Sequence, residues 1–301
     1  RPDIVDSERE KLLERIRAGM NNKRAYAIER LYAHMCCCED YAVPRLGEEA
    51  DAERIHYRKL TMRYHDALAT SPVEIFYCGS LEGRHVARIL TDVLATMPRG
   101  EIDEDIGTDI RMNALEAEPR YVTETLPVAQ GQLAVGYRLG ACMEEPDIPA
   151  LFVFNALYGG CVTSKLFLNV REKLSLCYYA SSAYHRSKGI VTVSSGIECR
   201  DVETAKREIL AQLASVQRGE FEEWEVEGAR ACLIASLESR GDSAGRMEEN
   251  ALGQAATGIR ETADELIAAL RAVTNERIAE AAQSMTLDTV YFLTGEDSKD
   301  E

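Results

Sequence analysis

The alternation of apolar residues in the middle of the chain constrains its fold most. Residues 131–139 read GQLAVGYRL, so an apolar side chain returns at every second position from Leu133 to Leu139. This period of two is typical of a β-strand that buries one face of a sheet. The strands predicted in this half of the chain are 120–128, 131–139, 176–186, 189–198 and 289–296. We expect the first four to form one mixed or antiparallel sheet, with one face buried and the other wet or lining a cavity.

Most of the remaining chain has apolar residues at helical spacing. The predicted helices are one long or broken helix over 7–38, then 57–68, 82–96, a helix started by Pro146 and Pro149 and closed by Gly159-Gly160, 164–174, 201–218, 221–240, 243–257, 262–272 and 275–284. Capping boxes are predicted at Ser7-x-x-Glu10 and Thr262-x-x-Glu265. The segment EIFYCGS, residues 74–80, is predicted to be a strand. Strands followed by a helical block indicate an α+β fold, with the helices of 201–284 covering one face of the sheet.

Charge and composition exclude some classes of protein. The 301 residues carry a net charge of −16, which argues against a nucleic-acid or anionic-membrane binder. No apolar run reaches the length of a membrane span, and the first residues are charged rather than those of a signal peptide. The nine cysteines include no C-x-x-C pair and predict reduced thiols in the cytoplasm. Cys36–Cys38 are expected to be small buried side chains rather than metal ligands.

A weak internal repeat indicates a duplication. The segment ending at Gly79 resembles the segment ending at Gly295, 216 residues later. A duplication predicts that residues 1–100 are the C-terminal part of a first unit, truncated on its N-terminal side, and that 101–301 are a second unit. The polar stretch 97–109 is the predicted linker.

Motifs for self-sufficient catalysis are absent from the sequence. The five histidines form neither H-E-x-x-H nor H-x-x-E-H, so no helix presents two imidazoles one turn apart to zinc. The sequence also contains no G-x-S-x-G elbow and no P-loop. These residues alone therefore predict no catalytic centre.

One stretch nevertheless resembles a known family. LYGGCVTSKLFLNVREKLSLCYYASSAY, within residues 155–185, is similar to the second homologous domain of the inverted-zincin peptidases, such as insulinase, pitrilysin and the mitochondrial processing peptidase. The similarity keeps the glycine pair and seven further residues: Ser164, Leu166, Phe167, Arg171, Glu172, Leu176 and Tyr178. It is nearest to the bacterial companion subunits that lack the zinc motif. The resemblance implies duplicated peptidase-like α/β units.

The resemblance also implies roles for particular residues. Arg171 and Tyr178 match a pair that holds the substrate peptide and its developing oxyanion, and a guanidinium and a phenol are suitable donors for that purpose. An arginine bonded to local carbonyls and a half-buried tyrosine would be the structural alternative. Glu8 matches the third zinc ligand of the family, although an acid in the first turn of a helix is also favoured by the helix dipole.

The expected function follows from that resemblance. The chain would be a non-catalytic subunit or C-terminal region of a zinc metallopeptidase, a hydrolase that is inactive alone. Zinc is expected on a partner or an upstream segment, with none bound by this chain alone. The expected partners are a peptide and either a zinc-bearing homologous subunit or a second copy. Two alternatives stay open: a fragment of a self-sufficient zinc peptidase with H-x-x-E-H upstream, or a structural protein that retains the fold for assembly.

Overall fold

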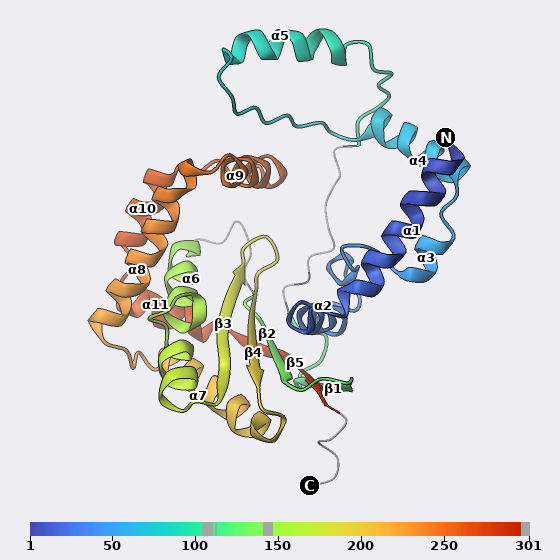
Figure 1. Ribbon diagram of the computed structural model, residues 1–301. Coiled ribbons are helices and arrows are strands. Elements are labelled where there is room, and N and C mark those ends of the chain that lie inside the picture. The colour runs from blue at the N-terminus through green and yellow to red at the C-terminus, as the bar shows by residue number, and fades with distance from the viewer. Residues whose placement is uncertain (104–110, 112, 141–146, 296–301) are drawn as a thin grey trace. The chain divides into compact units, whose positions relative to one another are not determined.

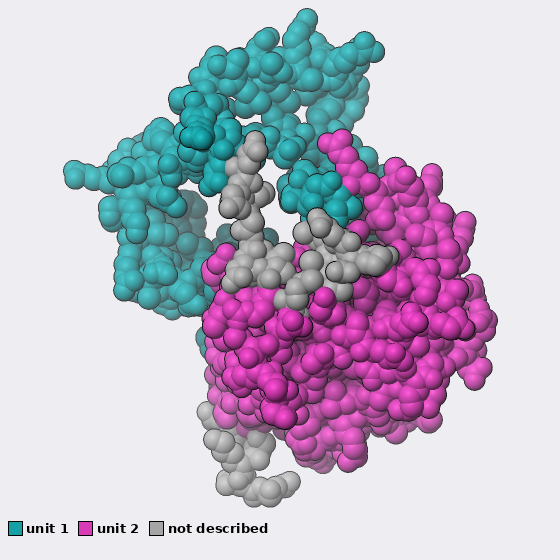
Figure 2. Space-filling model, turned by 180° about the vertical axis from the view of Figure 1, so that it is seen from behind, with its two compact units in different colours: residues 1–20, 44–108, 241–259 teal, residues 21–43, 109–240, 260–301 magenta. Residues whose placement is uncertain are grey.

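The computed structural model describes residues 1–103, 111, 113–140 and 147–295. They divide into two compact units, shown in different colours in Figure 2. Unit 1 comprises 1–20, 44–108 and 241–259, and unit 2 comprises 21–43, 109–240 and 260–301. Unit 2 contains the sheet, so the α+β fold is confirmed. The duplication boundary near residue 100 stays a prediction.

Five strands of unit 2 form one mixed sheet, and the segments predicted to form it do so (Figure 1). They are β1 (Arg120–Thr125), β2 (Gly131–Arg138), β3 (Cys177–His185), β4 (Ile190–Ile197) and β5 (Thr286–Thr294). The order is β1-β5-β2-β4-β3. β1 pairs with β5 in parallel, and the other pairings are antiparallel. The last strand of the chain therefore lies between the first two, and β3 forms one edge.

The prediction that one face of the sheet is wet or lines a cavity is wrong for β2 and β4. Every residue of β2 and β4 is buried. Leu133 and Val135 share a core with apolar residues of the helices described below, whereas Ala134 packs with Leu31 of α2 (Lys23–Met35). Gly136 leaves room for α2, because a Cβ at this position would lie 2.5 Å from the sulfur of Met35. Helices therefore cover both faces of β2.

The helices of unit 2 lie close to the predicted ranges. They are α2, α6 (Ile148–Asn155), α7 (Val202–Gln217), α8 (Glu223–Glu238), α10 (Ala263–Arg271) and α11 (Asn275–Gln283), with the π-helical turns η2 (Ala156–Gly160) and η3 (Leu166–Lys173). Residues from all except α2 join the large core. The capping box of Thr262 and Glu265 is confirmed. Pro146 lies outside the described residues.

Unit 1 is formed by helices α1 (Pro2–Gly19), α3 (Glu49–Glu53), α4 (Tyr57–Thr70), α5 (Gly83–Leu94) and α9 (Ala244–Thr257). The predicted helix over 7–38 is thus broken, since α1 ends at Gly19 and Asn22 caps α2 by accepting a hydrogen bond from Ala25 N. The capping box at Ser7 is wrong, because α1 begins at Pro2 and Ser7 lies inside the helix.

The strand predicted over 74–80 is also wrong. These residues form no strand, and Ile75, Phe76 and Tyr77 are exposed. A strand is defined by hydrogen bonds to a neighbour, and the described part of unit 1 contains no other strand to supply them. Of the predicted linker, residues 97–103 are described, and Gly100 N donates to Ala69 O. The remaining linker residues lie outside the described range.

A buried ionic cluster joins the segment after α2 to the sheet of unit 2. Glu39 accepts hydrogen bonds from Arg138 Nη2 at 2.6 Å and from Lys188 Nζ, and Arg138 Nε donates to Asp288 Oδ2 at 2.7 Å. The side chains of Glu39 and Arg138 are each only 1% exposed. Burial would raise the pKa of Glu39, but the bonds from Lys188 and Arg138 outweigh it and lower that pKa below its usual value.

The cysteine run beside this cluster is only partly buried. Cys36 is buried, as predicted, and burial raises the pKa of its thiol to about 11. Cys37 and Cys38 are exposed, because α2 ends at Met35 and the chain turns away from the core.

Within the described ranges, no helix has the length and apolar character needed to cross a bilayer.

Candidate functional site

Arg171 and Tyr178 line the same open cavity of about 460 Å³ in unit 2. Arg171 lies in the last turn of η3, and Tyr178 lies at the start of β3. The side chain of Arg171 is 40% exposed, and Tyr178 is 61% exposed. Both side chains therefore lie on a concave surface of unit 2 and outside its core.

A left-handed residue between η3 and β3 brings the two side chains to one cavity. Ser175 has φ = 52°, a conformation that residues other than glycine rarely adopt. The carbonyls at the end of η3 accept hydrogen bonds across this corner: Arg171 O from Ser175 N and Val170 O from Leu176 N, both at 3.1 Å. The helix therefore ends within two residues, and the chain reverses into β3.

This corner gives the first testable prediction. A left-handed conformation costs an L-residue about 1–2 kcal/mol, and glycine avoids this cost. Glycine also loses more conformational entropy on folding, which offsets part of the gain. Ser175→Gly should therefore raise the free energy of unfolding by about 0.5–1 kcal/mol. Thermal or urea unfolding measures it. Ser284→Gly is the matched control, because Ser284 has an ordinary φ of −70° at the end of α11, where glycine should destabilise the protein. Equal effects of the two changes would contradict the assignment.

A β-bulge aims the Tyr178 side chain at the cavity. Cys177 pairs with Ile197 and Tyr179 pairs with Gly196, so Tyr178 is the extra residue on β3. A bulge changes the direction of the side chain that it carries. The Tyr178 hydroxyl donates to Glu198 Oε1 at 2.6 Å, and this bond raises the pKa of the phenol. The phenol is therefore protonated and able to donate at neutral pH. Glu198 was not predicted from the sequence.

The glycine pair before η3 allows close packing against β3. A Cβ at Gly159 would lie 2.7 Å from the backbone nitrogen of Ser182, a contact that no side chain tolerates. Both η2 and η3 are π-helical, and π-helical turns occur frequently at functional sites. Gly159 thus lets the segment that leads into η3, the element that carries Arg171, approach β3 closely.

Glu8 lies in unit 1, on α1. Its carboxylate forms an ion pair with Lys11 Nζ at 2.6 Å, and its side chain is 63% exposed. Among the residues that the structure describes, no group of three histidine, cysteine, aspartate or glutamate side chains is arranged to hold a metal. The described residues therefore do not fit a zinc site of their own, and the role of Glu8 as a ligand stays a prediction.

Comparison with known proteins identifies the family. The family model described as "Peptidase M16 inactive domain" matches residues 57–233. The "Probable inactive metalloprotease YmfF" of Bacillus subtilis (strain 168) is 32% identical over 293 residues, which are 97% of this chain and 67% of that protein. The "Uncharacterized zinc protease YmxG" of the same organism is 28% identical over 178 residues, which are 56% of this chain and 42% of that protein.

A solved structure has a similar fold. The crystal structure of a conserved protein from Enterococcus faecalis V583 has a TM-score of 0.88 and 29% identity, covering 100% of this chain and 70% of that one. The resemblance found in residues 155–185 is thereby confirmed at the level of the family. The matched residues include both Arg171 and Tyr178. This chain belongs to the M16 peptidase family and matches the inactive domain of that family.

Proposed function

We propose that this chain is the non-catalytic subunit, or a C-terminal region, of a zinc metallopeptidase. Arg171 and Tyr178 would bind the peptide that is cleaved. One observation carries the proposal: an arginine and a tyrosine, exposed and brought together by a left-handed corner and a bulge, line one open cavity. A merely structural pair would not need two unusual backbone features to reach solvent.

The two side chains suit a peptide carbonyl whose oxygen gains negative charge. The guanidinium carries several N–H donors and no acceptor, and the protonated phenol carries one O–H. Donors aimed at a growing oxyanion stabilise the transition state more than the ground state. The Tyr178 hydroxyl donates to Glu198, so a bound peptide would have to replace Glu198 as its acceptor.

The metal must come from elsewhere in this proposal. The sequence contains no H-x-x-E-H, and the described residues offer no three-ligand cluster. Zinc would be held by a homologous subunit or by residues upstream. Bacillus subtilis has both a relative named as probably inactive and a relative named as a zinc protease. This supports a partner that is a related chain rather than a second copy of this one. The complex would form in the cytoplasm, where the described cysteines would stay free thiols.

Tyr178→Phe tests the proposal in the assembled peptidase. It removes a single hydroxyl, and we expect turnover to fall by about 10²-fold, the usual effect of losing one oxyanion donor. Tyr121→Phe is the matched control, because Tyr121 is 60% exposed on β1 at the opposite edge of the sheet from β3. Peptide cleavage and melting temperature are measured on both variants. Full activity of the Tyr178→Phe complex would contradict the proposal, and so would an equal loss in the control.

The structural alternative predicts a different pattern. If the chain serves only assembly, Tyr178→Phe should leave cleavage by the complex unchanged per folded molecule.

A further inference from the structure

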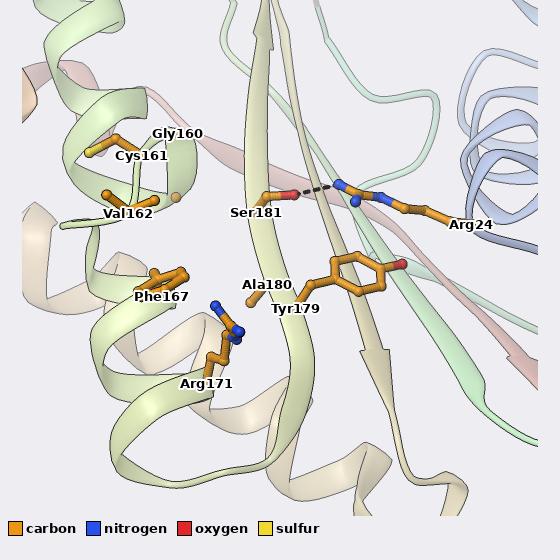
Figure 3. Close-up of a pocket in the computed structure, with 10 residues that line it drawn as sticks. Arg24, Gly160, Cys161, Val162, Phe167, Arg171, Tyr179, Ala180 and Ser181 are labelled. Carbon is orange, nitrogen blue, oxygen red and sulfur yellow. Dashed lines mark hydrogen bonds between the residues drawn. The ribbon is translucent and has the colours of Figure 1, made fainter. Parts of the chain in front are cut away.

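A second cavity, of about 260 Å³, lies beside the outer strand of the sheet (Figure 3). Its wall includes Gly160, residues 179–181 of β3, and two arginines. Arg24 comes from α2 and Arg171 comes from η3, and Figure 3 shows them on opposite sides of β3. The cavity thus brings together two guanidinium groups from segments that lie far apart in the sequence.

Arg24 is held in place by uncharged groups. Its Nη2 donates to Ser181 Oγ at 2.9 Å, and its guanidinium carbon lies 4.1 Å from the centre of the Tyr179 ring. Tyr179 is itself fixed, since its hydroxyl donates to Gln132 Oε1 at 2.7 Å. Within the described ranges no carboxylate pairs with Arg24. The guanidinium is therefore oriented while its charge is not neutralised.

Arg171 is only weakly neutralised. Its guanidinium carbon lies 4.6 Å from the centre of the Phe167 ring, and its carboxylate neighbour is the adjacent Glu172, 3.6 Å away and 54% exposed. Exposed pairs of this kind contribute little. Two poorly neutralised arginines at one cavity are unexpected in a chain with a net charge of −16. An anion in the cavity would balance their charge.

The position of the cavity indicates what kind of anion it would take. β3 is an edge strand of the sheet, and an extended peptide can add to such an edge through its backbone. Guanidinium groups bind carboxylates through paired N–H donors. We propose that this cavity is a subsite for an acidic side chain of the bound peptide, with Arg24 as its principal donor and Arg171 adding positive potential. This inference rests on the proposed function.

Binding of peptides to the full-length protein tests the subsite without any cleavage. The probes are two fluorescein-labelled decapeptide pools with amidated C-termini. Every position except the centre is random, and Asp and Glu are left out of the random positions. The central residue is Glu in one pool and Gln in the other. We expect the Glu pool to bind about 10-fold more tightly, as for a charge-assisted hydrogen bond. The negative charge of the whole chain favours the Gln pool, so such a preference must be local.

Variants assign the preference to Arg24. Arg24→Gln should reduce it to less than twofold and leave affinity for the Gln pool unchanged, whereas Arg24→Lys should retain part of it. Arg200→Gln is the control, because Arg200 is 80% exposed in the same unit, and the 10-fold preference should survive. Melting temperatures verify that each variant is folded.

Three results would overturn the inference. Equal binding of the two pools by the unmodified protein would do so while leaving the proposed function intact. A preference that survives Arg24→Gln would also overturn it. Failure of both pools to bind would contradict both the subsite and the proposed function.

Discussion

Arg171→Ala is expected to lower the turnover of the assembled peptidase by about 10³-fold, the upper end of the range for removing one oxyanion donor. The large effect follows from the charge of the guanidinium and from its position, since Arg171 lines both open cavities of unit 2 described above. Its side chain is 40% exposed and its ion pair with Glu172 lies at the surface, so the melting temperature should change little. Peptide cleavage by the complex measures the first effect, and thermal unfolding of the chain measures the second.

The control for Arg171→Ala is Arg200→Ala, an equal truncation of an exposed arginine in the same unit. It should leave turnover within about twofold. An Arg171→Ala protein that melts earlier but forms a fully active complex would show that the arginine is structural. Arg171→Lys separates charge from geometry, because lysine keeps the charge and loses the planar fork. We expect it to recover only part of the lost turnover.

Glu39→Gln is expected to reduce the free energy of unfolding by about 3–5 kcal/mol, the usual result of breaking a buried ion pair. The change leaves Arg138 and Lys188 buried with only Asp288 to balance them. For a unit of this size the melting temperature should fall by roughly 10 °C. The exposed pair of Glu220 and Arg218 provides the control, and Glu220→Gln should leave the free energy of unfolding nearly unchanged.

The pH dependence of this effect has a definite sign. The pKa of Glu39 is lowered in the folded protein, so its carboxylate stabilises the fold above the usual glutamate pKa of about 4.3. That contribution is lost as the pH falls through the lowered folded value. The difference between the unmodified protein and Glu39→Gln should therefore be full at pH 7 and shrink below about pH 4. A difference that is constant with pH would contradict the ionic assignment.

The sequence predicted helices well where local signals were strong. The ranges of α7 to α11 follow from apolar spacing, and Thr262 with Glu265 marks the start of α10. It could not predict that β5 lies between β1 and β2, because strand order depends on contacts between residues more than 100 positions apart. The small residues Ala134 and Gly136 were the available sign that α2 packs on the second face.

The same limit applies to the candidate site. Arg171 and Tyr178 were located because they lie in one continuous motif. Glu198 and Arg24 were missed, since pairing of β3 with β4 brings the first to Tyr178 and packing of α2 brings the second to Ser181. In the observed register, pairing of the predicted strands 176–186 and 189–198 places residue 198 near residue 177.

The division of labour between two chains is tested most directly by the zinc content and peptide-cleaving activity of the full-length protein, of a zinc-bearing homologue from the same cell, and of their mixture. The proposal predicts that this protein alone holds no stoichiometric zinc and cleaves nothing, and that cleavage needs the mixture. One tightly held zinc per chain together with cleavage by this protein alone would contradict it. Equally fast cleavage by the homologue without this protein would contradict it as well.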